Sequence, residues 1–120
     1  MTGREWVVDA YGCLPGALRD QQLVAKLFEQ LTSTLALKPL RPPEWHHFPD
    51  PGGITGFVLL EESHIACHTF PEYGSMCLNV FCCSPKPEFN YVFFLAREFG
   101  AESVRVRRLD RTYGTLPPAA

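Results

Sequence analysis

The sequence predicts a two-layer α+β sandwich, in which an antiparallel sheet carries two helices on one face. Segments rich in strand formers alternate with two segments whose apolar residues recur at helical spacing. Their order is strand, helix, three or four strands, helix, strand. The chain of 120 residues is long enough for one core and too short for two. We therefore expect a single domain over residues 1–120.

The first predicted strand covers residues 6–11, which are rich in strand formers, and Gly12 ends it. A helix is predicted from Leu18 to about Leu35, because the apolar positions in this segment recur every three or four residues. These positions are Leu23, Val24, Leu27, Phe28, Leu31 and Leu35. A connection interrupted by prolines follows at residues 39–51, with room for one short strand.

Three more strands are predicted at residues 53–61, 64–70 and 75–82, with a turn at residues 71–74 between the last two.

Pro87 suits the first turn of a second helix, and Gly100 suits its end. Residues 103–109 alternate apolar and basic side chains, which is typical of a final strand with one solvated face.

Composition narrows the class of function. The net charge of −2 and the pI of about 6.0 give no basic surface, so we expect neither nucleic acid nor an anionic membrane as a partner. No apolar run approaches the ~18 residues of a membrane span, and residues 1–5 do not resemble a signal segment. A cytoplasmic protein with five free cysteines is expected.

Chemically versatile residues gather in one stretch of the chain. Glu62-Ser63-His64 is followed by a His-Thr-Phe-Pro-Glu-Tyr-Gly run at residues 68–74, and Val-Phe-Cys-Cys follows at residues 80–83. This pattern resembles the self-processing segment of the bacterial, pyruvoyl-dependent S-adenosylmethionine decarboxylases, and weaker similarity extends from about Trp6 to about Tyr113. The resemblance implies a proenzyme that supplies decarboxylated S-adenosylmethionine for spermidine and other polyamines.

The resemblance also implies how the cofactor arises. The chain would cut itself between Glu62 and Ser63, giving fragments 1–62 and 63–120, and Ser63 would become a pyruvoyl group. This group would form a Schiff base with the substrate amine and accept electrons as CO₂ leaves, as pyridoxal phosphate does elsewhere. A serine hydroxyl is a weak nucleophile, so the cut needs a proton acceptor and oxyanion donors. His68 and Thr55 are the candidates for this support.

The family places a general acid at Cys83, and register favours this residue over Cys82, although an exchange of roles stays open. Two small apolar cysteines in a strand are the alternative interpretation. In the family, the glutamate at Glu72 accepts hydrogen bonds from the substrate's ribose hydroxyls. Phe48 and Phe70 are candidates to stack on adenine, and core packing is their alternative role.

Ser63 and His68 have opposite parity and lie about 16 Å apart along an extended strand, so one straight strand does not bring them together. The family solves this problem by forming active sites between two subunits. We therefore expect a homodimer with shared active sites that acts on a small-molecule substrate.

Three alternatives remain. Phe70, Ser75 and Asn79 stand where the family usually has tryptophan, tyrosine and aspartate, which leaves arginine or ornithine open as the substrate. A non-catalytic regulatory subunit would be expected to lose Ser63, His68 or Cys83, and all three are present. The metal-ligand types for zinc are present without Cys-x-x-Cys spacing, so no metal is predicted.

Overall fold

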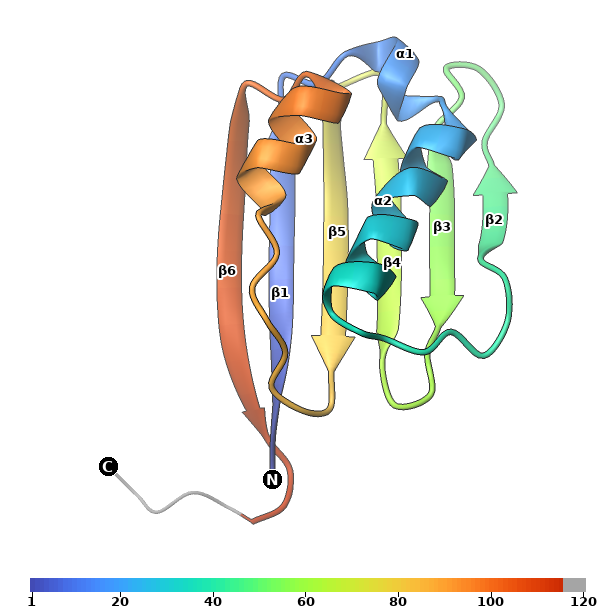
Figure 1. Ribbon diagram of the computed structural model, residues 1–120. Coiled ribbons are helices and arrows are strands. Elements are labelled where there is room, and N and C mark those ends of the chain that lie inside the picture. The colour runs from blue at the N-terminus through green and yellow to red at the C-terminus, as the bar shows by residue number, and fades with distance from the viewer. Residues whose placement is uncertain (116–120) are drawn as a thin grey trace.

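The computed structural model describes residues 1–115, which form a six-stranded antiparallel sheet with helices on one face (Figure 1). The strands are β1 (Thr2–Tyr11), β2 (Glu44–His47), β3 (Ile54–Leu59), β4 (His64–Phe70), β5 (Ser75–Cys82) and β6 (Ser103–Thr112). The helices are α1 (Pro15–Leu18), α2 (Gln21–Thr34) and α3 (Tyr91–Phe99). The predicted fold class is confirmed.

The strands lie in the order β2-β3-β4-β5-β1-β6, so β4 pairs with β3 on one side and with β5 on the other. Successive side chains of β4 point to opposite faces of the sheet. Ile65 and Cys67 are fully buried beneath the helices, whereas His64 and His68 lie on the face that no helix covers. We call this second surface the open face.

The first helical segment begins differently from the prediction. A single turn, α1, ends at Leu18, and α2 starts at Gln21 because Asp20 caps it. Asp20 has extended backbone angles, and its carboxylate accepts a hydrogen bond from the Leu23 amide. The prediction of one helix from Leu18 was therefore wrong at its start, and a short third helix was missed.

The start of α3 was also predicted too early. Pro87 lies outside the helix, and Asn90 caps it by accepting a hydrogen bond of 3.0 Å from the Phe93 amide. The helix ends at Gly100, which adopts the left-handed conformation with φ 69°, as predicted. The segment between Cys83 and Asn90 is thus a loop that remains free to line a pocket.

The two strands at the chain ends are longer than the sequence suggested. β1 pairs with β6 from Thr2–Thr112 to Tyr11–Ser103, and this continuous pairing carries both strands beyond their predicted ends. The short strand allowed for within residues 39–51 is β2, at the edge of the sheet beside β3.

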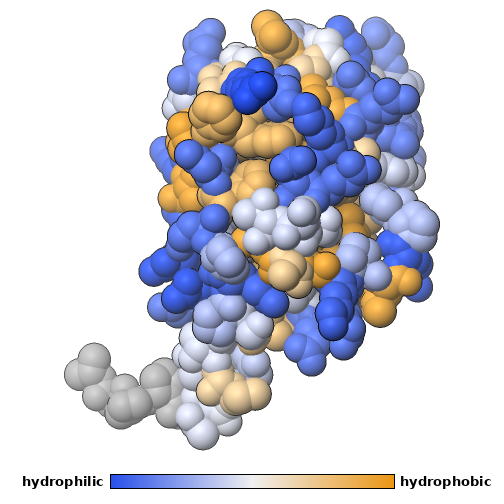
Figure 2. Space-filling view, viewed as in Figure 1, coloured by the Kyte–Doolittle hydropathy of each residue, from blue (hydrophilic) through white to orange (hydrophobic). Residues whose placement is uncertain are grey.

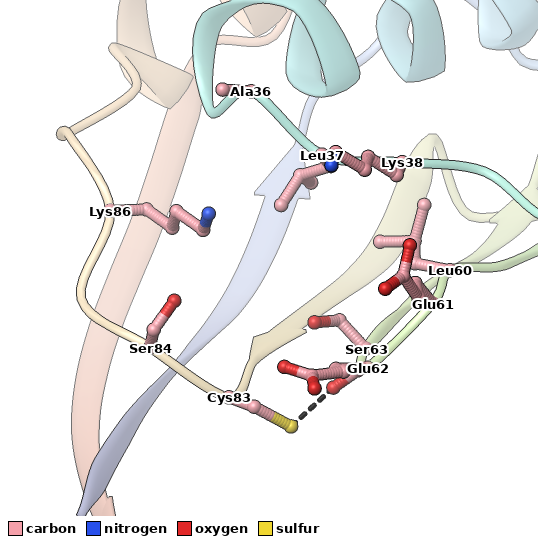
Figure 3. Close-up of a pocket in the computed structure, with 10 residues that line it drawn as sticks. All are labelled: Ala36, Leu37, Lys38, Leu60, Glu61, Glu62, Ser63, Cys83, Ser84 and Lys86. Atoms are coloured by element: carbon pink, nitrogen blue, oxygen red, sulfur yellow. Dashed lines mark hydrogen bonds between the residues drawn. The ribbon is translucent and has the colours of Figure 1, made fainter.

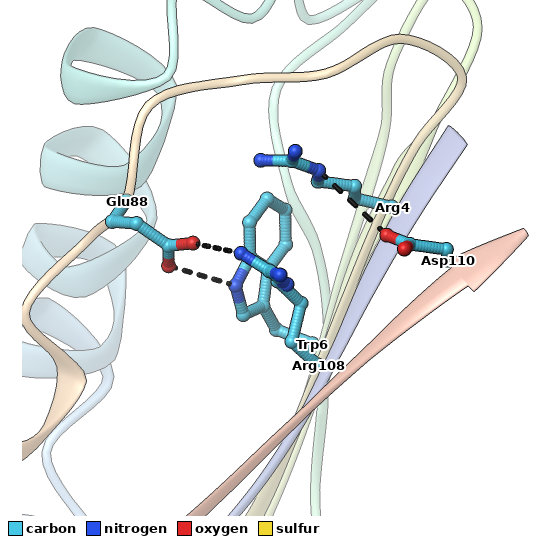
Figure 4. A network of polar contacts seen from close by, with 5 residues as sticks. All are labelled: Arg4, Trp6, Glu88, Arg108 and Asp110. Atoms are coloured by element: carbon cyan, nitrogen blue, oxygen red, sulfur yellow. Dashed lines mark hydrogen bonds and ion pairs between the residues drawn. The ribbon is translucent and has the colours of Figure 1, made fainter. Parts of the chain in front are cut away.

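Trp6 is the largest fully buried side chain, and it links the core to the loop before α3. Its indole N–H donates to the Glu88 carboxylate over 3.3 Å, and Arg108 from β6 donates to the same carboxylate over 2.7 Å (Figure 4). The tryptophan therefore holds the loop between β5 and α3 against the sheet.

The helix-bearing face is mixed in character (Figure 2). Hydrophilic side chains surround patches of hydrophobic ones. Leu14, Val92 and Phe93 are among the large apolar side chains that stay exposed. Within residues 1–115 no helix is both long and apolar enough to cross a membrane.

Replacing Trp6 by alanine is expected to lower the free energy of unfolding by about 3–5 kcal/mol, because it leaves a cavity at the centre of the core. Urea denaturation measures the change. Val92→Ala on the exposed side of α3 serves as the control and should stay within about 0.5 kcal/mol of the wild type. Equal stability of the two variants would contradict the central role of Trp6.

Candidate active site

The sequence-predicted residues fall into two pockets near opposite ends of β4. The first, the Ser63 pocket, is a cavity of about 180 Å³ lined by Glu62, Ser63 and Cys83. The second, the His68 pocket, has about 290 Å³ and is lined by Phe48, Thr55, His68, Phe70 and Glu72. All of the predicted site residues therefore line a pocket. They are divided between two pockets and do not share a single one.

The Ser63 pocket is built by two turns that lie side by side. The turn between β3 and β4 supplies Glu62 and Ser63, and the loop after β5 supplies Cys83. The two turns meet because His64 pairs with Phe81 at the start of the β4–β5 ladder. Figure 3 shows the hydroxyl of Ser63 pointing into the space between these segments.

Cys83 contacts the peptide bond at which the sequence predicts a cut. Its thiol donates a hydrogen bond to the carbonyl oxygen of Glu62, drawn as a dashed line in Figure 3. The Tyr113 hydroxyl donates to the Cys83 carbonyl over 2.6 Å and so holds the cysteine backbone. A donor on the Glu62 carbonyl is placed to stabilise negative charge on that oxygen.

The two neighbouring cysteines differ in environment. Cys82 is fully buried, and burial raises the pKa of its thiol to about 11 despite the opposing effect of the Lys86 ammonium. Cys83 is half-buried and lines the Ser63 pocket. Geometry therefore favours Cys83 for chemistry and gives Cys82 the place of a core side chain.

Sequence reasoning missed several residues of the Ser63 pocket. Lys38, Ser84 and Lys86 also line it, as does the acidic Glu61. Figure 3 shows Lys86 and Ser84 reaching into the cavity from the loop after Cys83. Nothing in the sequence pattern marks Ser84 and Lys86, because they follow Cys83 in a loop that has no periodicity.

The His68 pocket brings four kinds of side chain together. His68 Nδ1 and Thr55 Oγ1 lie 3.0 Å apart in a hydrogen bond across the β3–β4 pair, where the two residues are register partners. Phe48 and Phe70 are 52% and 37% exposed, so the alternative that they pack in the core is wrong. Glu72 lies at the rim, in the turn after β4 that Gly74 closes with φ 67°.

Among residues 1–115, no three His, Cys, Asp or Glu side chains gather closely enough to hold a metal ion.

The fold and the two pockets define a class of protein: a two-layer α+β domain with a serine in a cavity beside a peptide carbonyl that accepts a hydrogen bond from a cysteine thiol. A family model described as S-adenosylmethionine decarboxylase matches residues 4–112. The chain therefore belongs to the S-adenosylmethionine decarboxylase family.

Individual relatives agree with this assignment. The S-adenosylmethionine decarboxylase proenzyme of Shouchella clausii is 31% identical over 117 residues, which cover 97% of this chain and 89% of the relative. The proenzyme of Archaeoglobus fulgidus is 32% identical over 112 residues, covering 92% and 98%. The crystal structure of adenosylmethionine decarboxylase from Aquifex aeolicus matches with a TM-score of 0.76 and 22% identity, over 98% of this chain and 97% of that one. This last likeness supports the fold.

The contrast between the cysteines predicts selective labelling. Brief treatment with iodoacetamide at pH 8 is expected to modify Cys83 and to spare Cys82 and Cys67. The pKa of the buried Cys67 thiol is raised to about 12, so only roughly one molecule in ten thousand carries its thiolate at that pH. Peptide mass spectrometry reports each site, and labelling in denaturant is the control. Modification of Cys82 before Cys83 would contradict the assignment.

Proposed function

We propose that this chain is a self-processing decarboxylase of S-adenosylmethionine whose pyruvoyl group is made from Ser63. The observation that carries the proposal is the thiol of Cys83 on the carbonyl of Glu62, with the Ser63 hydroxyl in the same cavity. Membership of the family supports the reaction class and the substrate. The cytoplasmic location expected from the sequence stays a prediction.

The cut begins when the Ser63 hydroxyl attacks the carbonyl carbon of Glu62. The C–N bond of that peptide is exchanged for an ester, and the Cys83 thiol stabilises the charge on the Glu62 oxygen. Elimination then breaks the bond between Ser63 Cβ and the ester oxygen, and Glu62 becomes a carboxyl end. Hydrolysis of the residue left from Ser63 releases ammonia. The fragments are 1–62 and 63–120, of which residues 116–120 lie outside the described residues.

The pyruvoyl group supplies an electron sink for the substrate's α-carbon during loss of CO₂. The residues of the Ser63 pocket fit this chemistry. The Leu60 amide donates over 3.0 Å to the carbonyl oxygen of Ser63 and so provides a donor where negative charge develops. Cys83 gives its proton to the substrate carbon, and the Lys86 ammonium in the same cavity offsets the resulting charge.

A homodimer supplies the remaining groups. Ser63 and His68 are separated by about 16 Å of β4, so one protomer does not join them. In a two-fold dimer, the His68 pocket of one copy can lie against the Ser63 pocket of the other. His68 uses Nδ1 to bind Thr55, which assigns proton transfer during the cut to Nε2.

The His68 pocket suits the nucleoside part of the substrate. Phe48 and Phe70 offer two exposed aromatic rings for adenine, and the Glu72 carboxylate offers two oxygens for the ribose hydroxyls. The matching family and its relatives are described as S-adenosylmethionine decarboxylases, so arginine and ornithine are not favoured as substrates. Ser63, Cys83 and the Glu62 carbonyl also meet in one pocket, which a purely regulatory subunit does not need.

The proposal is tested by substitutions in the Ser63 pocket. Ser63→Ala should leave one uncut chain that releases no CO₂ from S-adenosylmethionine, because the nucleophile and the cofactor precursor are both removed. Cys83→Ala should be cut about a hundredfold more slowly, since the donor on the Glu62 carbonyl is lost. Intact mass and ¹⁴CO₂ release measure the two steps. Ser33→Ala on α2 is the control, and CO₂ release by uncut Ser63→Ala would refute the mechanism.

Shared active sites predict complementation between variants. His68→Ala alone should stay largely uncut, because every site lacks the proton-transfer group. When it is produced together with Ser63→Ala, mixed dimers contain one site with both Ser63 and His68, so the His68→Ala chain should now be cut. Distinct affinity tags and intact mass identify the cut chain. If mixing restores no cutting, the two pockets do not combine across a dimer.

A further inference from the structure

A chain of hydrogen bonds crosses the open face beside the proposed cut. Arg111 of β6 and Asn79 of β5 both donate to the carboxylate of Glu5 on β1, the amide over 2.7 Å. The other end of the Asn79 amide, Oδ1, lies 2.8 Å from Nε2 of His64. The chain thus ends on the residue that directly follows Ser63.

The carboxylate at one end fixes the direction of every bond. The hydrogen bond from Asn79 and the Arg111 guanidinium hold the pKa of Glu5 below its usual range, so Glu5 is an anion that only accepts. Asn79 must therefore turn its NH₂ group to Glu5 and its oxygen to His64. It follows that Nε2 of His64 carries a proton and donates. An aspartate at this position has no proton to give Glu5, so the amide joins two partners that a carboxylate would not.

Aromatic rings hold His64 on both of its faces. The imidazole stacks against Phe57 of β3, with centroids 6.0 Å apart and planes at 20°, and against Phe81 of β5, at 5.8 Å and 22°. The guanidinium of Arg111 lies 5.6 Å from the centre of the Phe81 ring. The ring of His64 is therefore confined by two stacking partners and one directed hydrogen bond.

We propose that His64 is a positioning residue that anchors the new chain end once the peptide before Ser63 is cut. This inference rests on the proposed function. After the cut, the backbone nitrogen of His64 carries the group made from Ser63, and a free strand end frays unless side chains tie it down. Within residues 63–64, the ties are the Leu60 hydrogen bond to the Ser63 carbonyl, the backbone pairing of His64 with Leu59 and Phe81, and the held His64 ring.

Hydrogen exchange of the segment 64–70 tests the anchor without relying on activity. His64→Ala is compared with the parent chain in two backgrounds, the wild type, which is cut, and Ser63→Ala, which is not. We expect faster exchange in both backgrounds, and a larger effect in the cut chain because the covalent tether is gone. His47→Ala, which removes a histidine from the edge strand β2, is the control and should leave the segment unchanged.

Two further variants separate the stack from the hydrogen bond. His64→Phe keeps an aromatic ring between Phe57 and Phe81, so it should retain most of the protection. Asn79→Leu leaves His64 in place and removes its hydrogen bond, so it should show an intermediate loss. This second variant also carries the test if His64→Ala does not fold.

The values of kcat and KM, calculated per chain that carries the pyruvoyl group, give a second readout. His64→Ala should lower kcat by about tenfold or more while KM changes less, because the reacting group is misplaced and the nucleoside contacts are intact. Exchange and kcat equal to the wild type would overturn the proposal, as would a loss of protection spread evenly over the whole sheet. A wild-type chain that never cuts would refute the proposed function, and exchange in the Ser63→Ala background would still decide whether His64 anchors the strand.

Discussion

The placement of β4 between β3 and β5 is the constraint on which the rest of the site depends. Hydrogen bonds on both sides fix its register, and the alternation of a strand sends Ile65 and Cys67 into the core. A shift by one residue would bury His68 and expose the core side chains. The same pairing sets the start of β4 against the end of β5, which brings Ser63 to Cys83.

The geometry of β4 also places Ser63 and His68 in different pockets. A straight strand holds Ser63 near one end and His68 near the other, so the residues proposed to make the cut are divided between two pockets. In the proposed dimer each protomer lends one pocket to its partner. The polar network of His64 lies on the open face, next to the turn that carries Ser63.

The sequence predicted the fold class and most strands, because period-two alternation and turn residues are local signals. Helix starts were less accurate: Asp20 and Asn90 cap α2 and α3 by their own side chains, and these caps overrode the apolar pattern at Leu18 and the proline signal at Pro87. Every site residue that was predicted from the motif lines one of the two pockets. Its spacing also indicated that Ser63 and His68 do not meet within one strand.

Other features required three dimensions. Lys86 lies in a loop without periodicity, and the loop's path depends on Trp6 and Arg108 holding Glu88 (Figure 4). The hydrogen bond from Cys83 to the Glu62 carbonyl joins residues on two turns, and the sequence of neither turn predicts this contact. Local sequence gives residue types and spacing, while such contacts depend on how distant strands align.

The central claim is that the chain converts Ser63 into its own cofactor, and intact-mass spectrometry of the purified protein tests it most directly. The account predicts two fragments that meet between Glu62 and Ser63, with the second fragment carrying the mass of a pyruvoyl group in place of serine. A single stable chain of 120 residues under conditions that support folding would contradict it.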